Sequence, residues 1–171
     1  KYIVITAKHH DGFAMFKSAA SPFNIVDATA FGRDPLKELA AVCRKHDLKL
    51  GFYYSHNYDW HHPGGGMGDW DPAHKGDTDN YVDDIVIPQL REILKNYGDI
   101  AILWFDMGAG NINRAGIDRI YKAVLDCNPR IIINDRLGAG YAGDTETPEQ
   151  SIPANGFPGK DWETCMTING T

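Results

Sequence analysis

The sequence has 171 residues, of which 43% are hydrophobic and 11% are aromatic, which is enough for one sizeable core but not for two. The formal net charge of −6 argues against nucleic acid or an anionic membrane surface as a partner and suits a neutral substrate better. Its three cysteines are an odd number without CxxC spacing, which argues against a structural zinc site and against a disulfide-built scaffold.

Strands and helices are predicted to alternate along the chain. An apolar, β-branched run at 2–7 indicates a buried strand, which a long loop follows. Asp34 and Pro35 begin a helix, because Asp can cap a helix and Pro suits its first turn. The next strand is predicted at 48–54, before a loop rich in His and Gly at 55–77.

The second half continues this alternation. A helix is predicted at 78–96, kinked or split by Pro88. A strand follows at 100–105, then a helix at 117–125 and a strand at 130–133, after which the sequence becomes loop-like. Such alternation predicts right-handed βαβ units around a parallel sheet, so that the four strands are neighbours in chain order with the helices outside.

Every predicted strand ends in polar side chains, at 8–11, 55–57, Asp106 and 134–136. A doubly wound open sheet would gather its ligand groups at one switch point and usually carries a Gly-rich phosphate turn, which this sequence lacks. Functional residues at the carboxyl end of every strand are typical of a barrel. We therefore expect an α/β fold that is part of a (β/α)8-like, TIM-type barrel with parallel strands, cropped at both ends.

Six motifs occur in order, and any one of them alone would be weak evidence. They are TAKHHDGF (6–13), GFYYS (51–55), LWFD (103–106), INDR (133–136), GDTETPEQ (143–150) and WETCMTING (162–170). Together they resemble the α-L-fucosidases of glycoside hydrolase family 29 over essentially the whole chain. The resemblance implies that residues 1–171 are the central part of a single catalytic barrel domain. It also implies a retaining exo-α-L-fucosidase that removes terminal α-linked L-fucose from glycans through a covalent glycosyl-enzyme intermediate.

Asp106 is the candidate nucleophile. A carboxylate directly after a buried strand costs desolvation energy unless it has a role there, the alternative being a helix cap or loop carboxylate. The acid/base of a retaining pair has to lie about 5–5.5 Å away, and Glu146, Glu149 and Glu163 are available downstream. Family members differ in which segment supplies it. We favour Glu149 over Glu163, which could instead support the site beside Trp162.

The resemblance also implies residues that bind the sugar. His9 and His10 are expected to bind sugar hydroxyls, since a neutral imidazole both donates and accepts hydrogen bonds, although one of them could merely orient the other. Tyr54 resembles the family's pocket tyrosine near the nucleophile, whereas Tyr53 is expected to pack in the barrel wall.

Two further residues are assigned in the same way. Trp104 is expected to face the apolar side of the sugar, with simple core packing as the alternative. Arg136 resembles a family arginine near the carboxylates, where it would hold one of them ionised and lower its pKa.

One loop is rich in potential metal ligands, namely His56, Asp59, His61, His62, Asp71 and His74. Their spacing matches no tight metal motif and the family needs no metal, so we expect neither a metal nor a cofactor. The loop is expected instead to shape the leaving-group subsite.

Three alternatives remain at this stage. A catalytically inactive glycan-binding barrel is disfavoured by the presence of Asp106, and a metal-dependent amidohydrolase by the lack of a strand-borne HxH. A related retaining glycosidase acting on another deoxy-sugar or on a galactoside is the third. The expected partner is a fucosylated oligosaccharide or glycoconjugate, without nucleic acid or membrane. The resemblance favours a secreted, periplasmic or lysosomal location.

Overall fold

The main sheet has four parallel strands in chain order. In the computed structural model, which describes residues 1–66, 75–108 and 110–168, they are β1 (Tyr2–Lys8), β2 (Lys49–Tyr54), β3 (Ile100–Phe105) and β4 (Ile132–Ile133). Each strand pairs in parallel with the next. The predicted order and direction of the four strands are therefore confirmed.

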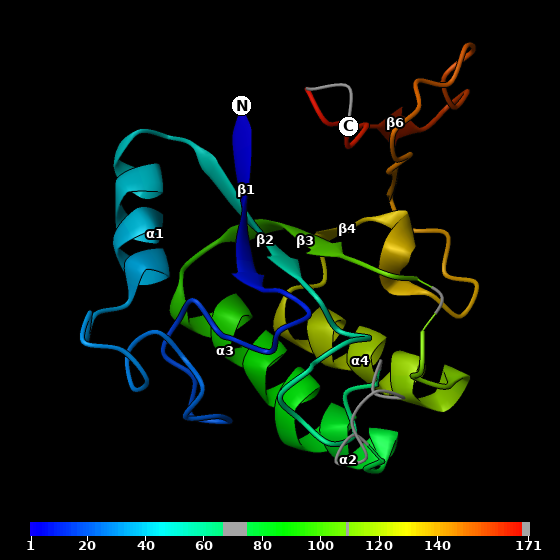
Figure 1. The fold of residues 1–171 in the computed structure, drawn as a ribbon. Coiled ribbons are helices and arrows are strands. Elements are labelled where there is room, and N and C mark those ends of the chain that lie inside the picture. The colour runs from blue at the N-terminus through cyan, green and yellow to red at the C-terminus, as the bar shows by residue number, and fades with distance from the viewer. Residues whose placement is uncertain (67–74, 109, 169–171) are drawn as a thin grey trace.

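Helices α3 (Ile87–Asn96) and α4 (Arg114–Cys127) lie together on one face of this sheet, and α1 (Pro35–Lys45) lies at its side (Figure 1). The predicted cap of α1 is confirmed, because the Asp34 side chain accepts a hydrogen bond from the backbone of Lys37 at 2.9 Å. The helix expected at 117–125 begins earlier, at Arg114, because Asn113 caps it by accepting from Gly116.

The helix predicted at 78–96 is interrupted ahead of its proline. A short α2 (Thr78–Tyr81) passes into a π-helical turn, η2 (Val82–Val86), before α3 begins. At this turn the amide of Ile87 donates to the carbonyl of Val82, five residues back. Pro88 has no amide hydrogen and its ring crowds the preceding turn, which explains the wider helical turn just before it.

The two faces of the sheet are covered differently. Phe52, Tyr54, Leu103 and Phe105 are completely buried and belong to the core that also contains the helices. The intervening side chains face the other way, and Tyr2, Tyr53, Trp104 and Ile132 line cavities on the opposite face. This alternation follows from the two-residue period of a strand.

The region expected to be a loop after Asn134 contains two more short strands. A 3-10 turn, η3 (Asp135–Leu137), is followed by β5 (Thr145–Glu146) and β6 (Asp161–Trp162), which pair in parallel. Single parallel bridges join Asn134 to Thr145 and Glu149 to Cys165, so the parallel order continues beyond β4. None of the helices described is long and apolar enough to span a membrane.

Candidate active site

Asp106 follows β3 directly and is held through both of its oxygens. The Tyr53 hydroxyl donates to Oδ2 at 2.6 Å, while the Met107 amide and Arg136 Nη1 donate to Oδ1 at 2.8 and 3.1 Å. Burial raises the pKa of Asp106, but these three hydrogen bonds outweigh it and hold the pKa below its usual value. The carboxylate is therefore kept ionised.

Arg136, in the middle of η3, joins two carboxylates. Its Nη1 lies 3.1 Å from Asp106 Oδ1 and also 3.1 Å from Glu149 Oε2. Its Nε and Nη2 donate to the side chain and backbone of Thr147 at 3.0 and 2.8 Å, which fixes the plane of the guanidinium. Because one nitrogen touches both carboxylates, their two oxygens lie no further apart than twice 3.1 Å, which is compatible with a retaining pair.

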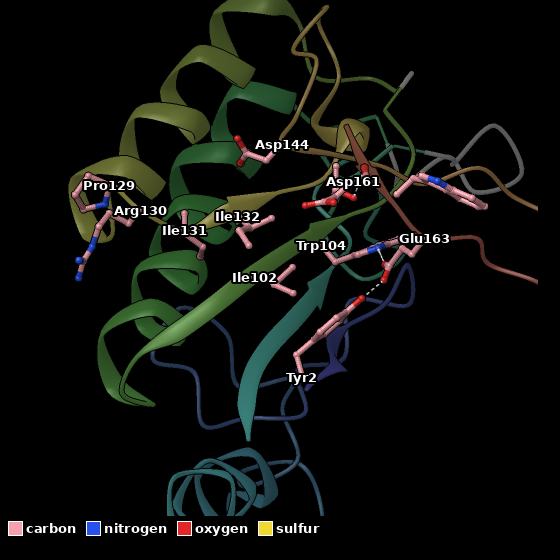
Figure 2. Close-up of a pocket in the computed structure, with 12 residues that line it drawn as sticks. Tyr2, Ile102, Trp104, Pro129, Arg130, Ile131, Ile132, Asp144, Asp161 and Glu163 are labelled. Carbon is pink, nitrogen blue, oxygen red and sulfur yellow. Dashed lines mark hydrogen bonds between the residues drawn. The ribbon is translucent and has the colours of Figure 1, made fainter. Parts of the chain in front are cut away.

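The other two candidate glutamates have different partners. Glu163 Oε1 accepts from Trp104 Nε1 at 2.7 Å, and Oε2 accepts from the Tyr2 hydroxyl (Figure 2). The hydrogen bond to Glu163 raises the pKa of Tyr2 to about 12. Glu146 is paired with Lys160. Among the described residues, Glu149 is thus the one glutamate that shares an arginine with Asp106.

His9 and His10 both reach this site despite being neighbours in sequence. His10 places Nδ1 2.6 Å from Ser55 Oγ and Nε2 3.8 Å from Asp106 Oδ2. The ring of His9 is stacked on that of Tyr53, with centroids 5.4 Å apart and planes at 6°. Burial, followed by the proximity of His9, lowers the pKa of His10, so its imidazole is neutral at pH 7.

One group of metal-ligand types occurs in the part of the chain that the structure describes. His9, His10 and Asp106 each offer an atom that lies within 4.8 Å of the others. The same imidazole and carboxylate atoms are also suited to the hydroxyl groups of a sugar.

The predicted roles of the two tyrosines of β2 are wrong and have to be exchanged. Tyr54 is completely buried on the helix side, where its hydroxyl donates to Gln89 Oε1 at 2.7 Å. Tyr53 points to the opposite face and holds Asp106. Successive strand side chains alternate between faces, so only one of the two could lie at the site.

Trp104 lies on the same face as Tyr53 and is largely buried, with 7% of its surface exposed. Its ring is stacked with that of Tyr53 at 5.4 Å between centroids, and the guanidinium of Arg136 lies 4.8 Å from its centre. The indole therefore packs against both side chains that bind Asp106, and its expected contact with a sugar stays a prediction.

In the described part of the His/Asp-rich loop, two of the potential metal ligands are buried and two are not. His56 and Asp59 are buried, and the expected role of the loop in a leaving-group subsite stays a prediction. His61 is stacked on Phe23, with ring centroids 4.2 Å apart. His62 Nδ1 accepts from the amide of Gly64 at 3.0 Å. The remaining two residues of this group, Asp71 and His74, lie outside the described residues.

A cavity near the site has a volume of about 630 Å³ and lies against the face of the sheet that carries Trp104. Tyr2, Trp104 and Glu163 line it, together with Ile132 and Trp162, whereas Asp106 does not (Figure 2). A second cavity of about 450 Å³ is lined by Tyr53, Trp104 and Glu163 among others, and so lies closer to the carboxylates. The hydrogen bonds around Asp106, rather than the larger cavity, define the candidate site.

A parallel α/β sheet with carboxylates and imidazoles at its carboxyl end is the arrangement of the (β/α)8-barrel enzymes. The family described as alpha-L-fucosidase matches residues 1–171, and the chain belongs to this family. Human plasma alpha-L-fucosidase is 32% identical over 99% of this chain and 37% of its own length. Rat tissue alpha-L-fucosidase is 27% identical, with the same coverage. The chain thus spans little more than a third of the length of these relatives.

Solved structures show the same fold. The alpha-L-fucosidase AlfC from Lactobacillus casei, in complex with alpha-L-fucose product, has a TM-score of 0.81 at 37% identity, covering 95% of this chain and 55% of that one. The alpha-L-fucosidase from Vibrio sp. strain EJY3 has a TM-score of 0.86 at 35% identity, covering 96% of this chain and 31% of that one.

Proposed function

We propose that the complete natural protein is a retaining exo-α-L-fucosidase, and that residues 1–171 form the central part of its catalytic barrel. The observation that carries the proposal is the shared contact of Asp106 and Glu149 with Arg136 at the carboxyl end of a parallel sheet. Membership of the alpha-L-fucosidase family supports it, as does the likeness to an enzyme that binds alpha-L-fucose as product.

In the proposed mechanism, the Asp106 carboxylate attacks the anomeric carbon and forms a glycosyl ester. Glu149 donates its proton to the departing glycosidic oxygen. In the second step Glu149, now a carboxylate, removes a proton from water, whose oxygen attacks the same carbon. The ester bond breaks, fucose leaves with retained configuration, and Asp106 is free again.

The neighbouring side chains have roles that follow from their contacts. Tyr53 and Arg136 keep Asp106 ionised for attack, because both donate hydrogen bonds to its carboxylate. His9 and His10 bind sugar hydroxyls next to Asp106. Trp104 and Glu163 help to fix the position of Arg136, because the indole donates to Glu163 and packs against the guanidinium.

The substrate we propose is a fucosylated oligosaccharide or glycoconjugate. One solved AlfC variant is in complex with Fuca(1,6)GlcNAc, which supports this class of ligand. We further propose a location outside the cytoplasm, supported by the names of the plasma and tissue relatives.

Hydrolysis of an aryl α-L-fucoside by the complete natural protein tests the proposal. We expect Asp106→Asn to lower the rate by several orders of magnitude while the fold remains intact. Azide or formate should partly restore Asp106→Ala and give the inverted product, because a small anion can replace the missing carboxylate. A variant that keeps more than about a tenth of the normal rate, a loss of only ~1.4 kcal/mol, would exclude Asp106 as nucleophile.

A further inference from the structure

Lys8 and Asp59 form an ion pair inside the protein, outside the candidate site. Lys8 is completely buried, and its Nζ lies 3.0 Å from Asp59 Oδ2. Nζ also donates to the Tyr81 hydroxyl at 2.8 Å, and the ring centres of Tyr54 and Tyr81 lie 5.0 and 5.3 Å from it. A buried ion pair gains little net stability, because desolvation of the two charges offsets their attraction. Net stability therefore does not account for this pair.

The pair joins two segments that are far apart in sequence. Lys8 is the last residue of β1, and Asp59 lies in the loop that follows β2. Asp59 Oδ1 accepts from the amides of His61 and His62, each at 2.9 Å, and the Asp59 amide donates to the carbonyl of Gly65 at 2.9 Å. Oδ1 of Asp59 thus stabilises the turn of its own loop, while Oδ2 binds Lys8 at the end of β1.

Backbone hydrogen bonds also connect the end of β1 and the loop after β2 around His10. The amide of Ser55 donates to the carbonyl of Lys8 at 3.0 Å, and the amide of Trp60 donates to the carbonyl of His10 at 2.7 Å. Ser55 Oγ then lies 2.6 Å from His10 Nδ1, which leaves Nε2 on the side of Asp106, 3.8 Å from Oδ2. The orientation of the imidazole therefore depends on how β1 and the loop are docked.

The segment after His10 packs closely against Asp59. Gly12, two residues after His10, has a φ of +80°, and a Cβ there would lie 2.2 Å from Asp59 Oδ1. We propose that the buried Lys8–Asp59 ion pair is a positioning device that docks residues 59–65 of the loop after β2 against the end of β1 and so directs His10 towards the sugar site. This inference rests on the proposed function. Lys8 and Asp59 touch no substrate in it and act through His10.

The test uses Lys8→Met and Asp59→Asn in the complete natural protein, with kcat and KM measured per folded molecule. Since a displacement of about 1 Å can reduce a rate by ~100-fold, we expect kcat/KM for an aryl α-L-fucoside to fall by about 10- to 100-fold. Lys17→Met is the matched control, because it removes an exposed lysine–aspartate pair, Lys17–Asp27, and should leave kcat/KM unchanged. The wild-type rate tests the proposed function separately from these ratios.

A double-mutant cycle separates positioning from a merely structural role. In a His10→Asn background, Lys8→Met should lower kcat/KM by less than about threefold, because residues that act through one another are not additive. A full loss in that background would overturn the proposal. So would single variants that unfold more easily yet keep the wild-type kcat/KM.

Tyr81→Phe covers the case in which Lys8→Met fails to fold. It keeps both charges and removes only the hydroxyl that binds Lys8 Nζ. We expect a smaller loss of kcat/KM that disappears in the His10→Asn background. In NMR spectra, which need no activity, the ring signals of His10 should shift in Tyr81→Phe but not in Lys17→Met. Unchanged ring signals together with an unchanged kcat/KM would refute the role of the pair.

Discussion

Arg136 is the residue on which the two carboxylates of the site depend. It is largely buried, and although burial lowers its pKa, the hydrogen bonds to Asp106 and Glu149 raise that pKa above its usual value. Its Nη1 contacts both carboxylates, while Nε and Nη2 are occupied by Thr147. An ammonium group cannot reproduce this set of contacts, because it lacks the planar fork of a guanidinium.

We therefore expect Arg136→Lys to lower kcat/KM by roughly 100-fold, since it removes charge-assisted hydrogen bonds worth about 1.5–3 kcal/mol from Asp106 and releases Glu149. Kinetics with an aryl α-L-fucoside measures the effect. Arg130→Lys is a matched control, because Arg130 is exposed and its side chain contacts neither Asp106 nor Glu149 in the described part of the chain. An active Arg136→Lys enzyme would contradict the proposed architecture.

Glu149 and Glu163 are distinguished by their contacts. Glu149 is exposed and touches Arg136, whereas Glu163 is held by Trp104 and Tyr2. In Glu149→Ala, an aryl fucoside with a good leaving group should form the intermediate at a near-normal rate and then stall until azide is added. Natural fucosides, with poor leaving groups, should hardly react.

Burst kinetics on both alanine variants checks this assignment. Glu163→Ala should instead impair substrate binding and the supporting contacts of Trp104, without a stalled intermediate. If Glu163→Ala gives the azide-dependent pattern and Glu149→Ala only weakens binding, the two glutamates exchange roles.

At the scale of the element, strand β2 offers a direct comparison of its two faces. Tyr53→Phe removes the hydrogen bond that lowers the pKa of Asp106, so this pKa should rise. Because the nucleophile must be ionised, the acid limb of the pH–rate profile should move to higher pH, and kcat should fall by about 10- to 100-fold. Stability should change little.

The same substitution one residue later should have the opposite consequences. Tyr54→Phe leaves Gln89 Oε1 without its buried donor, which should lower the free energy of unfolding by about 1–3 kcal/mol. The pH–rate profile of the folded enzyme should not move. Urea unfolding and pH–rate profiles of both variants distinguish the two faces, and equal effects on activity would show that the faces are not separated in this way.

The elements that could be predicted from the sequence are those with long apolar patterns. Strands β2 and β3 lie where apolar runs predict them, and the strand ends correctly located Asp106 and Arg136 at one edge. Strands β5 and β6 were missed because each has two residues, both polar or partly exposed, and no period can show in so short a segment.

The errors in the site have other causes. Leu50 and Phe52 are both buried in the core, so the two-residue alternation of β2 could have shown that Tyr54 lies on the inner face and that Tyr53 faces the site. The pairing of Lys8 with Asp59 joins residues 51 positions apart, so no local pattern could show it. Contacts of this kind are set by how the loops dock on the sheet.

At the scale of the whole molecule, His56 couples the fold to pH. It is completely buried, and its Nε2 lies 2.9 Å from the carbonyl oxygen of Leu137, so it links the loop after β2 to η3, which carries Arg136. Its Nδ1 has no partner among the described residues. Burial lowers the pKa of His56 to about 4.

We predict that the folded protein loses stability as the pH falls from 7 to 5. Below the ordinary histidine pKa of about 6.5, the unfolded chain takes up a proton at His56, whereas the folded protein does not do so until near pH 4. At pH 5 this difference amounts to about 2 kcal/mol from His56 alone. The partly buried His10 and His62, whose pKa values are also lowered, add to the loss. The carboxylates Asp59 and Asp106, whose folded pKa values are depressed, contribute only at lower pH, so the histidines account for the loss of stability between pH 7 and pH 5.

His56→Gln supplies the matched variant, because its amide nitrogen can still donate to the Leu137 carbonyl but takes up no proton. Urea unfolding at pH 7 and pH 5 should show a decrease in the free energy of unfolding that is smaller in His56→Gln than in wild type by about 2 kcal/mol. Equal decreases in the two proteins would mean that His56 is protonated as readily in the folded state as in the unfolded chain.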